Sequence, residues 1–361
     1  MRIAVGLTGA ALLLSGCAAG APRDGGQSAD RSSGTANVPA SETASSAAGP
    51  PRATVPTAAF VSVYGPDTDA PGALLPMVAT LRGAAAEESA QFTIELDGQP
   101  GVCSGPQWRH ATGLSQECWV TLPTRPGKAQ VTASARVTSP GGVAIPATGK
   151  YGVEATGPRA RAVTDAERDR IRRCGNPTER VWLTFDDGFE SMAALHATVD
   201  ALTARHVRGR FFGTGDWARR NPQMLAEIRR QGHLIENHSG SHRWLNTLDD
   251  ATLRAEIAAG PDADEPRLLR PGYGGGVFTD RVGSAAAALG LGMCFWTVDP
   301  RDWAGPDADL ILSRVLTGDD KTPPVRAGGV VLFHMTGAHT VEALPRVIDA
   351  IRAQGLELEG L

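Results

Sequence analysis

From residue 181 onward, short apolar runs alternate with segments whose apolar residues recur at helical spacing. Val181–Phe185, Arg210–Phe212 and Leu234–Asn237 have the character of strands, and helical patterns at 192–202 and 221–228 lie between them. Strands that alternate with helices predict a parallel sheet, because each strand needs a crossover before the next one can run in the same direction. We therefore expect an α/β fold with a barrel-like parallel sheet, in which the carboxyl ends of the strands carry the chemistry.

The alternation continues to the end of the chain. Further strands are predicted at Met293–Val298 and Gly329–Phe333, and further helices from Thr279, over Ile311–Val315 and from about Thr340. Ahead of the first strand, Thr164 and Glu167 have the spacing of a capping box, which predicts a short connecting helix.

Two of the predicted strand ends carry side chains that suit a metal ion. Asp186 and Asp187 end the first strand, and His238 and His242 follow the third with a spacing of four. Two imidazoles and one carboxylate with open positions are typical of a metal-assisted hydrolase. We expect Asp187, His238 and His242 to bind a divalent cation, Zn²⁺ first, with Co²⁺ or Ni²⁺ as alternatives. An iron oxygenase uses the same ligand types, but its motif has a carboxylate where Ser239 stands.

Three more polar clusters follow later strands or loops. They are Arg270–Gly274, Asp299–Trp303 and Leu332–His334. Because parallel strands end at the same edge of a sheet, we expect all five clusters to converge on one mouth.

In this order the clusters resemble those of the NodB-homology polysaccharide deacetylases, carbohydrate esterase family four, over residues 178–361. The resemblance implies a distorted (β/α) barrel and a metal-dependent enzyme with Asp187, His238 and His242 as ligands. The roles that it implies for the other residues are general base for Asp186, general acid for His334, orientation of the base by Arg270, oxyanion stabilisation by the backbone N–H of Tyr273, positioning by Asp302, and walls of the acetyl pocket for Trp303 and Leu332.

The chain departs from the family pattern at two of these motifs. Gly272 stands where the third motif usually has a second proline, and Met335 stands where the fifth often has an aspartate. We expect the glycine to loosen its loop. Both departures should affect substrate preference more than activity.

Residues 1–17 have the pattern of an export signal. The apolar stretch Ile3–Leu14 is too short to span a bilayer, and Leu14–Cys17 resembles a bacterial lipobox. A lipidated Cys17 would anchor the chain at the outer face of the cell membrane, facing the wall. An ordinary signal peptide is the alternative. Residues 18–56, rich in Ala, Gly, Ser, Thr and Pro, should form a disordered linker.

Residues 57–156 have the character of an all-β domain, and 157–177 form a connecting segment. Apolar and polar residues alternate at 60–64, 91–96 and 129–137, with glycine and proline clusters between them. A small immunoglobulin-like sandwich is the expected form. The domain is either a carbohydrate-binding module or a spacer packed on the catalytic domain.

Five cysteines fit an exported protein. Setting aside Cys17 leaves four, which can form two disulfides in three ways. We favour Cys103 with Cys118, which are close in sequence, and Cys174 with Cys294, which both precede predicted core strands. The alternative is that one or more stay free.

Charged residues make up 20% of the chain and the formal net charge is −4, with no basic stripe interleaved with aromatics. We therefore expect no nucleic-acid partner, and we expect a monomer. The favoured function is N-deacetylation of a wall glycan, with peptidoglycan N-acetylglucosamine or N-acetylmuramic acid as the sugar and acetate as a product. The alternatives are an O-acetyl esterase of xylan type and a glycan-binding wall protein with weak activity.

Overall fold

The computed structural model describes residues 60–138 and 144–361. The predictions for Cys17, for the export signal at 1–17 and for the linker at 18–56 therefore concern residues outside those described. Among the described residues, no helix has the length and apolar character needed to cross a membrane.

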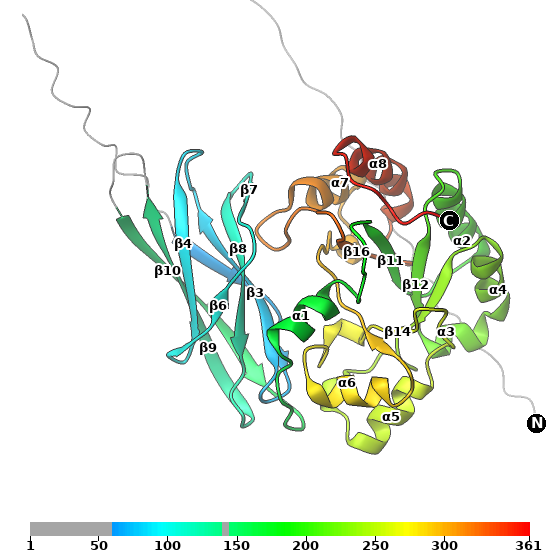
Figure 1. Cartoon of the computed structure of the whole chain (residues 1–361), viewed down its shortest axis with the longest axis horizontal. Coiled ribbons are helices and arrows are strands. Elements are labelled where there is room, and N and C mark those ends of the chain that lie inside the picture. The colour runs from blue at the N-terminus through cyan, green and yellow to red at the C-terminus, as the bar shows by residue number, and fades with distance from the viewer. Residues whose placement is uncertain (1–59, 139–143) are drawn as a thin grey trace, which may run out of the picture. The chain divides into compact units, whose positions relative to one another are not determined.

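Residues 60–155 form two five-stranded sheets, which Figure 1 shows side by side. The first sheet has the order β1-β3-β8-β6 with β7 paired to β8, and the second has the order β2-β10-β9-β4-β5. The strands of the first sheet are β1 (Phe60–Tyr64), β3 (Leu74–Arg82), β6 (Val102–Cys103), β7 (Trp108–His110) and β8 (Gly113–Thr121). Those of the second are β2 (Thr68–Asp69), β4 (Ser89–Leu96), β5 (Gln99–Pro100), β9 (Gly127–Thr138) and β10 (Ala144–Ala155).

The alternating patterns predicted β1, β4 and β9, but β3, β8 and β10 have no counterpart in the sequence analysis. In β4 every second residue is buried, so one face points to the core and the other to solvent. In β3 nearly every residue is buried, because the strand also faces the second part of the molecule, where the Thr80 hydroxyl donates to the carbonyl of Asp320. A strand covered on both faces loses the period of two on which the prediction depends.

The second part of the molecule is built on a six-stranded sheet with the order β15-β14-β13-β12-β11-β16. All five strand pairs are parallel, which confirms the predicted α/β sheet. Its strands are β11 (Trp182–Asp187), β12 (Gly209–Gly213), β13 (Leu234–Asn237), β14 (Leu268–Leu269), β15 (Gly292–Met293) and β16 (Val330–His334).

The predicted strand over Met293–Val298 is confirmed only at its two ends, because Met293 belongs to β15 and Val298 forms an isolated parallel bridge with Val331 of β16. β15 ends at Met293, and the Phe295 N–H donates to the carbonyl of Ile171, outside the sheet. The disulfide from Cys294 also draws this segment toward the connecting helix. The apolar run is therefore interrupted between β15 and the bridge at Val298.

Eight α-helices accompany the sheets in the described ranges. They are α1 (Asp165–Arg172), α2 (Met192–Thr203), α3 (Gly215–Arg220), α4 (Pro222–Arg230), α5 (Asp250–Ala258), α6 (Asp280–Ala287), α7 (Ala308–Thr317) and α8 (Thr340–Ala353). The predicted capping box of α1 is confirmed by reciprocal bonds between Thr164 and Glu167. Helices α2, α4, α7 and α8 lie next to one another beside the sheet, around a core that includes stacked Phe185 and Phe211 (Figure 1).

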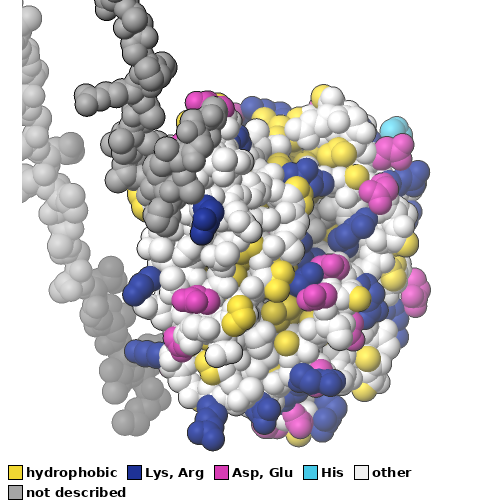
Figure 2. Space-filling view, turned by 60° about the vertical axis from the view of Figure 1, so that its left-hand side comes forward, with side chains coloured by type: hydrophobic (Ala, Val, Ile, Leu, Met, Phe, Trp, Pro, Cys, Tyr) yellow, Lys and Arg dark blue, Asp and Glu magenta, His cyan; other side chains and the backbone are white. Residues whose placement is uncertain are grey.

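Both favoured disulfides are present in the structure. Cys103 on β6 faces Cys118 on β8, and Cys174, just after α1, joins Cys294, just after β15. The first bond closes a loop within one sheet, and the second ties the connecting segment to the end of β15. On the face shown in Figure 2, positive and negative side chains are interspersed, with hydrophobic side chains exposed between them.

Candidate active site

Asp187, His238 and His242 lie together at the carboxyl edge of the parallel sheet. Asp187 ends β11, and His238 directly follows β13. One potential ligand atom from each residue lies within 4.8 Å of the others. The Nε2 atoms of His238 and His242 are 3.7 Å and 3.5 Å from Oδ1 of Asp187. Residues about fifty positions apart in sequence thus form one cluster, as the motif spacing predicted.

The hydrogen bond of His238 leaves its Nε2 free to bind a metal ion. Its Nδ1 lies 2.7 Å from the carbonyl oxygen of Arg270. Because a carbonyl can only accept, Nδ1 carries the proton, and the lone pair of Nε2 faces Asp187. Burial and the neighbouring His242 lower the pKa of His238 to about 3. A neutral imidazole pair with one carboxylate fits a divalent cation such as Zn²⁺, Co²⁺ or Ni²⁺.

Asp186 lies beside this cluster and is held by Arg270. The Arg270 side chain is fully buried, and its Nη1 donates to Oδ1 of Asp186 at 2.6 Å and to the Thr184 hydroxyl at 3.0 Å. The other carboxylate oxygen, Oδ2, lies 3.7 Å from Nε2 of His238. Burial raises the pKa of Asp186, and the charges of Arg270 and His334 oppose that rise. One oxygen is thus fixed while the other faces the cluster.

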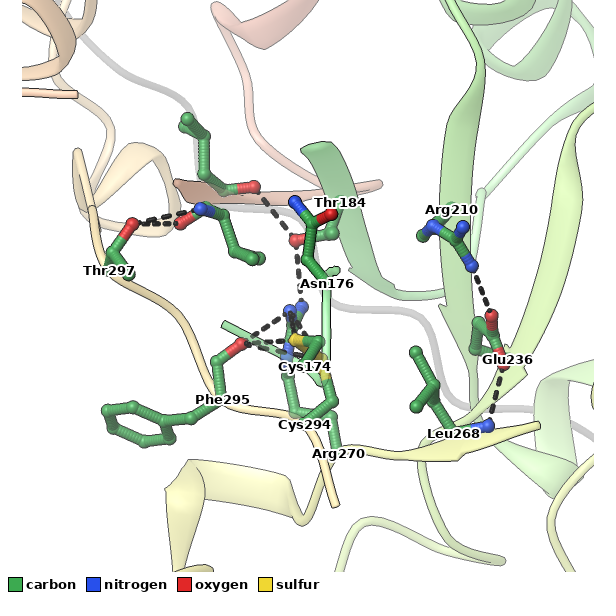
Figure 3. The surroundings of a disulfide bond; sticks show 12 residues. Cys174, Asn176, Thr184, Arg210, Glu236, Leu268, Arg270, Cys294, Phe295 and Thr297 are labelled. Carbon is green, nitrogen blue, oxygen red and sulfur yellow. Dashed lines mark hydrogen bonds and ion pairs between the residues drawn. A yellow bond between two sulfur atoms is a disulfide. The ribbon is translucent and has the colours of Figure 1, made fainter. Parts of the chain in front are cut away.

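The Cys174–Cys294 disulfide contacts the other side of the same guanidinium (Figure 3). Nη2 of Arg270 donates to the Phe295 carbonyl at 2.9 Å and lies 3.3 Å from Sγ of Cys294. The guanidinium carbon is also 4.1 Å from the centroid of the Phe212 ring. The sequence predicted the disulfide and the arginine separately. No pattern in the sequence joins them, because their contact arises from the fold.

His334 ends β16 and is positioned by Asp302. Asp302 accepts a hydrogen bond from Nδ1 of His334 at 2.8 Å, and its second oxygen accepts from the His334 N–H and the Thr340 hydroxyl. Burial acts to lower the pKa of His334, but the hydrogen bond and charge of Asp302, with the charges of Asp186 and Asp187, raise it to about 9. With Nδ1 committed to Asp302, Nε2 is the nitrogen left to exchange a proton. Thr340 was missed in the sequence analysis.

Several residues of the site have left-handed backbone conformations. The φ angles are 81° for Asp187, 60° for His242, 59° for Tyr273 and 55° for Arg301. Such conformations cost of order 1–3 kcal/mol each and persist only where the surroundings impose them. Their concentration at the mouth of the sheet supports a functional role for this region.

An aromatic pair borders the cluster. The Tyr273 ring lies 4.4 Å from that of His242 and stacks on Trp244 at 4.5 Å between centroids. Trp244 was not singled out from the sequence. A Cβ at Gly272 would lie 3.0 Å from the His242 ring, so the glycine permits this close approach. The predicted pocket walls differ in exposure, since Trp303 is 58% exposed whereas Leu332 is buried in β16.

The comparisons with known proteins concern this same half of the chain. The pattern of the polysaccharide deacetylase family matches residues 175–294. A chitooligosaccharide deacetylase from Bradyrhizobium sp. (strain ANU 289) is 32% identical over 205 residues, which are 51% of this chain and 90% of that protein. A peptidoglycan-N-acetylglucosamine deacetylase from Bacillus cereus is 30% identical over 190 residues, 50% of this chain and 85% of the relative.

Among solved structures, a family 4 carbohydrate esterase from Streptomyces lividans in complex with acetate is 28% identical. The match covers 51% of this chain and 92% of that one, with a TM-score of 0.44.

Proposed function

The chain belongs to the polysaccharide deacetylase family, and from that premise we propose that it is a metal-dependent hydrolase that removes N-acetyl groups from an extracellular glycan. Peptidoglycan is the proposed polymer, with N-acetylglucosamine or N-acetylmuramic acid as the sugar and acetate as the product. The observation that carries the proposal is the cluster of Asp187, His238 and His242 with Asp186 beside it.

The three clustered side chains would hold the cation. A bound divalent cation supplies Lewis acidity, which polarises the acetyl carbonyl and makes water a better nucleophile near neutral pH. The remaining requirements of amide hydrolysis fall to this chain's own residues.

Asp186 is placed to accept the proton of the attacking water. Arg270 donates to its Oδ1 and opposes the rise in pKa that burial causes, and its Oδ2 faces the cluster. The backbone N–H of Tyr273 is the proposed donor to the developing oxyanion.

His334 is placed to act as the general acid. An amine leaves poorly from a tetrahedral centre unless it is protonated, so an amide needs a group that carries a proton near neutral pH. Asp302 keeps His334 protonated and fixes its ring. Trp303 and Leu332 would border the acetyl group.

The proposed location follows from the export pattern of residues 1–17 and the lipobox at Cys17. A lipid anchor and the linker of residues 18–56 would place the enzyme at the outer face of the cell membrane, within reach of wall polymer.

Release of acetate from purified peptidoglycan fragments tests the proposal. The zinc-loaded protein should release acetate, a chelator should abolish the release, and adding zinc back should restore it. Absence of release from every N-acetylated glycan offered to the metal-loaded protein would contradict it.

A further inference from the structure

A cavity of about 220 Å³ lies between the first β-sheet and the loops of the catalytic domain. Its lining comes from both parts of the chain and includes Tyr64, Asp67, Trp244, Tyr273, Asp299 and Lys321. Tyr64 ends β1, whereas the last four belong to loops of the catalytic domain.

The two walls are held together by a buried interface. Asp69 on β2 is 5% exposed, and its Oδ1 accepts hydrogen bonds from the Asn246 amide at 2.9 Å and the Gly276 N–H at 3.1 Å. Trp119 of β8 packs edge-on against Phe278 at 5.2 Å between centroids. Because Gly276 lies just after the Tyr273 loop, the β-sheets are fixed against the segment that borders the metal ligands.

The cavity borders the candidate active site through the side chain of Tyr273, and none of the three proposed metal ligands lines it. The Tyr273 ring that lines it also contacts the ring of His242, one of the three proposed ligands. Trp244 lines the same cavity and stacks on Tyr273 with an angle of 10° between the rings. A ligand in the cavity would therefore lie one side chain away from the reacting group.

The lining has the chemistry that recognises a sugar ring. Aromatic faces cover the apolar C–H face of a pyranose, and charged groups at the edge bind its hydroxyls. Lys321 places its Nζ 4.8 Å from the centroid of the Tyr64 ring, and Asp67 and Asp299 add acceptors. The volume is below the range of about 300–1,000 Å³ for drug-sized ligands. This size suits a single ring.

We propose that this cavity is a saccharide subsite that holds a sugar flanking the one that loses its acetyl group. The β-sheets are then part of the substrate cleft and not a spacer. The inference rests on the proposed function, because it concerns recognition of the same glycan.

The test compares substrates of different length. For the zinc-loaded full chain, kcat/KM for release of acetate is measured on the disaccharide and the hexasaccharide of N-acetylglucosamine. We expect kcat/KM to be about ten-fold higher for the hexasaccharide, because its additional sugars can occupy the cavity. A ten-fold change corresponds to about 1.4 kcal/mol of binding free energy. In Tyr64→Ala the ratio of the two values should fall about three-fold or more.

Phe60→Ala is the matched control. Phe60 is an aromatic residue of the same strand, 58% exposed and outside the cavity, so its removal should leave the ratio unchanged. If Tyr64→Ala does not fold, Lys321→Ala carries the same prediction, since Lys321 is exposed and contacts Tyr64.

The outcomes separate the two proposals. No acetate from either substrate, or from the peptidoglycan fragments used to test the proposed function, would overturn the proposed function and the subsite with it. Release with equal kcat/KM for both lengths, or an unchanged ratio in the cavity variants, would overturn the subsite alone.

Discussion

The parallel sheet contains two buried ion pairs that look alike and differ in what they do. Arg270 pairs with Asp186 at 2.6 Å. Arg210 pairs with Glu236 at 3.0 Å (Figure 3). Both arginines are almost fully buried, and each lies over an aromatic ring, Phe212 for Arg270 and Trp182 for Arg210.

The difference lies in the second oxygen of each carboxylate. Oε2 of Glu236 accepts the Leu268 N–H at 2.9 Å, so it is bound to the sheet itself. Oδ2 of Asp186 instead points toward Nε2 of His238, 3.7 Å away. Burial raises the pKa of both acids, so burial and charge do not identify the functional pair. The functional pair is identified by Oδ2 of Asp186, which lies beside the imidazoles and is not bound to the sheet.

The largest effect is expected when the carboxylate of each ion pair is replaced by an amide. Asp186→Asn keeps the shape but cannot accept the proton of water, so kcat should fall about a thousandfold. Glu236→Gln should leave kcat nearly unchanged and lower the free energy of unfolding by about 2 kcal/mol, because a charged hydrogen bond is lost. Acetate release and denaturant unfolding measure the two effects. Equal loss of kcat in two folded variants would contradict the distinction.

The next effect separates an amide substrate from an ester. His334→Ala should lower kcat about a hundredfold on an N-acetylated sugar, because the amine must be protonated as it leaves. On an O-acetylated xylan oligomer the same variant should lose far less of its kcat. Parallel assays on both substrates measure the ratio, and equally small losses on both would favour the esterase alternative.

Removal of the disulfides compares a bond beside the site with one far from it. Because Cys174–Cys294 contacts Arg270, Cys174→Ser with Cys294→Ser should lower kcat about ten-fold, as expected when a catalytic group is misplaced. Cys103→Ser with Cys118→Ser should leave kcat unchanged, although it too loses stability. The assay is run where both variants remain folded by circular dichroism. An unchanged kcat in the first double variant would show that the Cys174–Cys294 disulfide does not position Arg270.

The smallest effect is a shift in the pH profile. Because Asp302 raises the pKa of His334, Asp302→Asn should let the imidazole lose its proton at lower pH. The basic limb of the kcat profile should then move down by about one unit. Glu342→Gln is the control, since Glu342 pairs with His339 and not with His334. A basic limb that stays in place would argue against His334 as the acid.

The sequence was sufficient where chemistry follows local pattern and insufficient where it depends on packing. Strand ends and motif order placed Asp187, His238 and His242 together, because parallel strands end at one edge. Trp244 and Thr340 could not be predicted, since they act through contacts between distant segments.

The β-sheets illustrate the same limit. β3 was missed because it is buried on both sides, and that burial is itself the sign that the sheet packs on the catalytic domain. Asp69 has nothing in its sequence neighbourhood to distinguish it from a surface aspartate, yet it bridges to Asn246 and Gly276.

Metal stoichiometry tests the central claim most directly, which is that Asp187, His238 and His242 hold the cation while Asp186 does not. Zinc binding to the full chain is measured by calorimetry for the wild type, Asp186→Asn, Asp187→Asn and His242→Ala, with His339→Ala as an exposed-histidine control. The account predicts one tight equivalent for the wild type, Asp186→Asn and His339→Ala, and its loss in the other two. Retention of tight zinc in Asp187→Asn, with loss in Asp186→Asn, would contradict it.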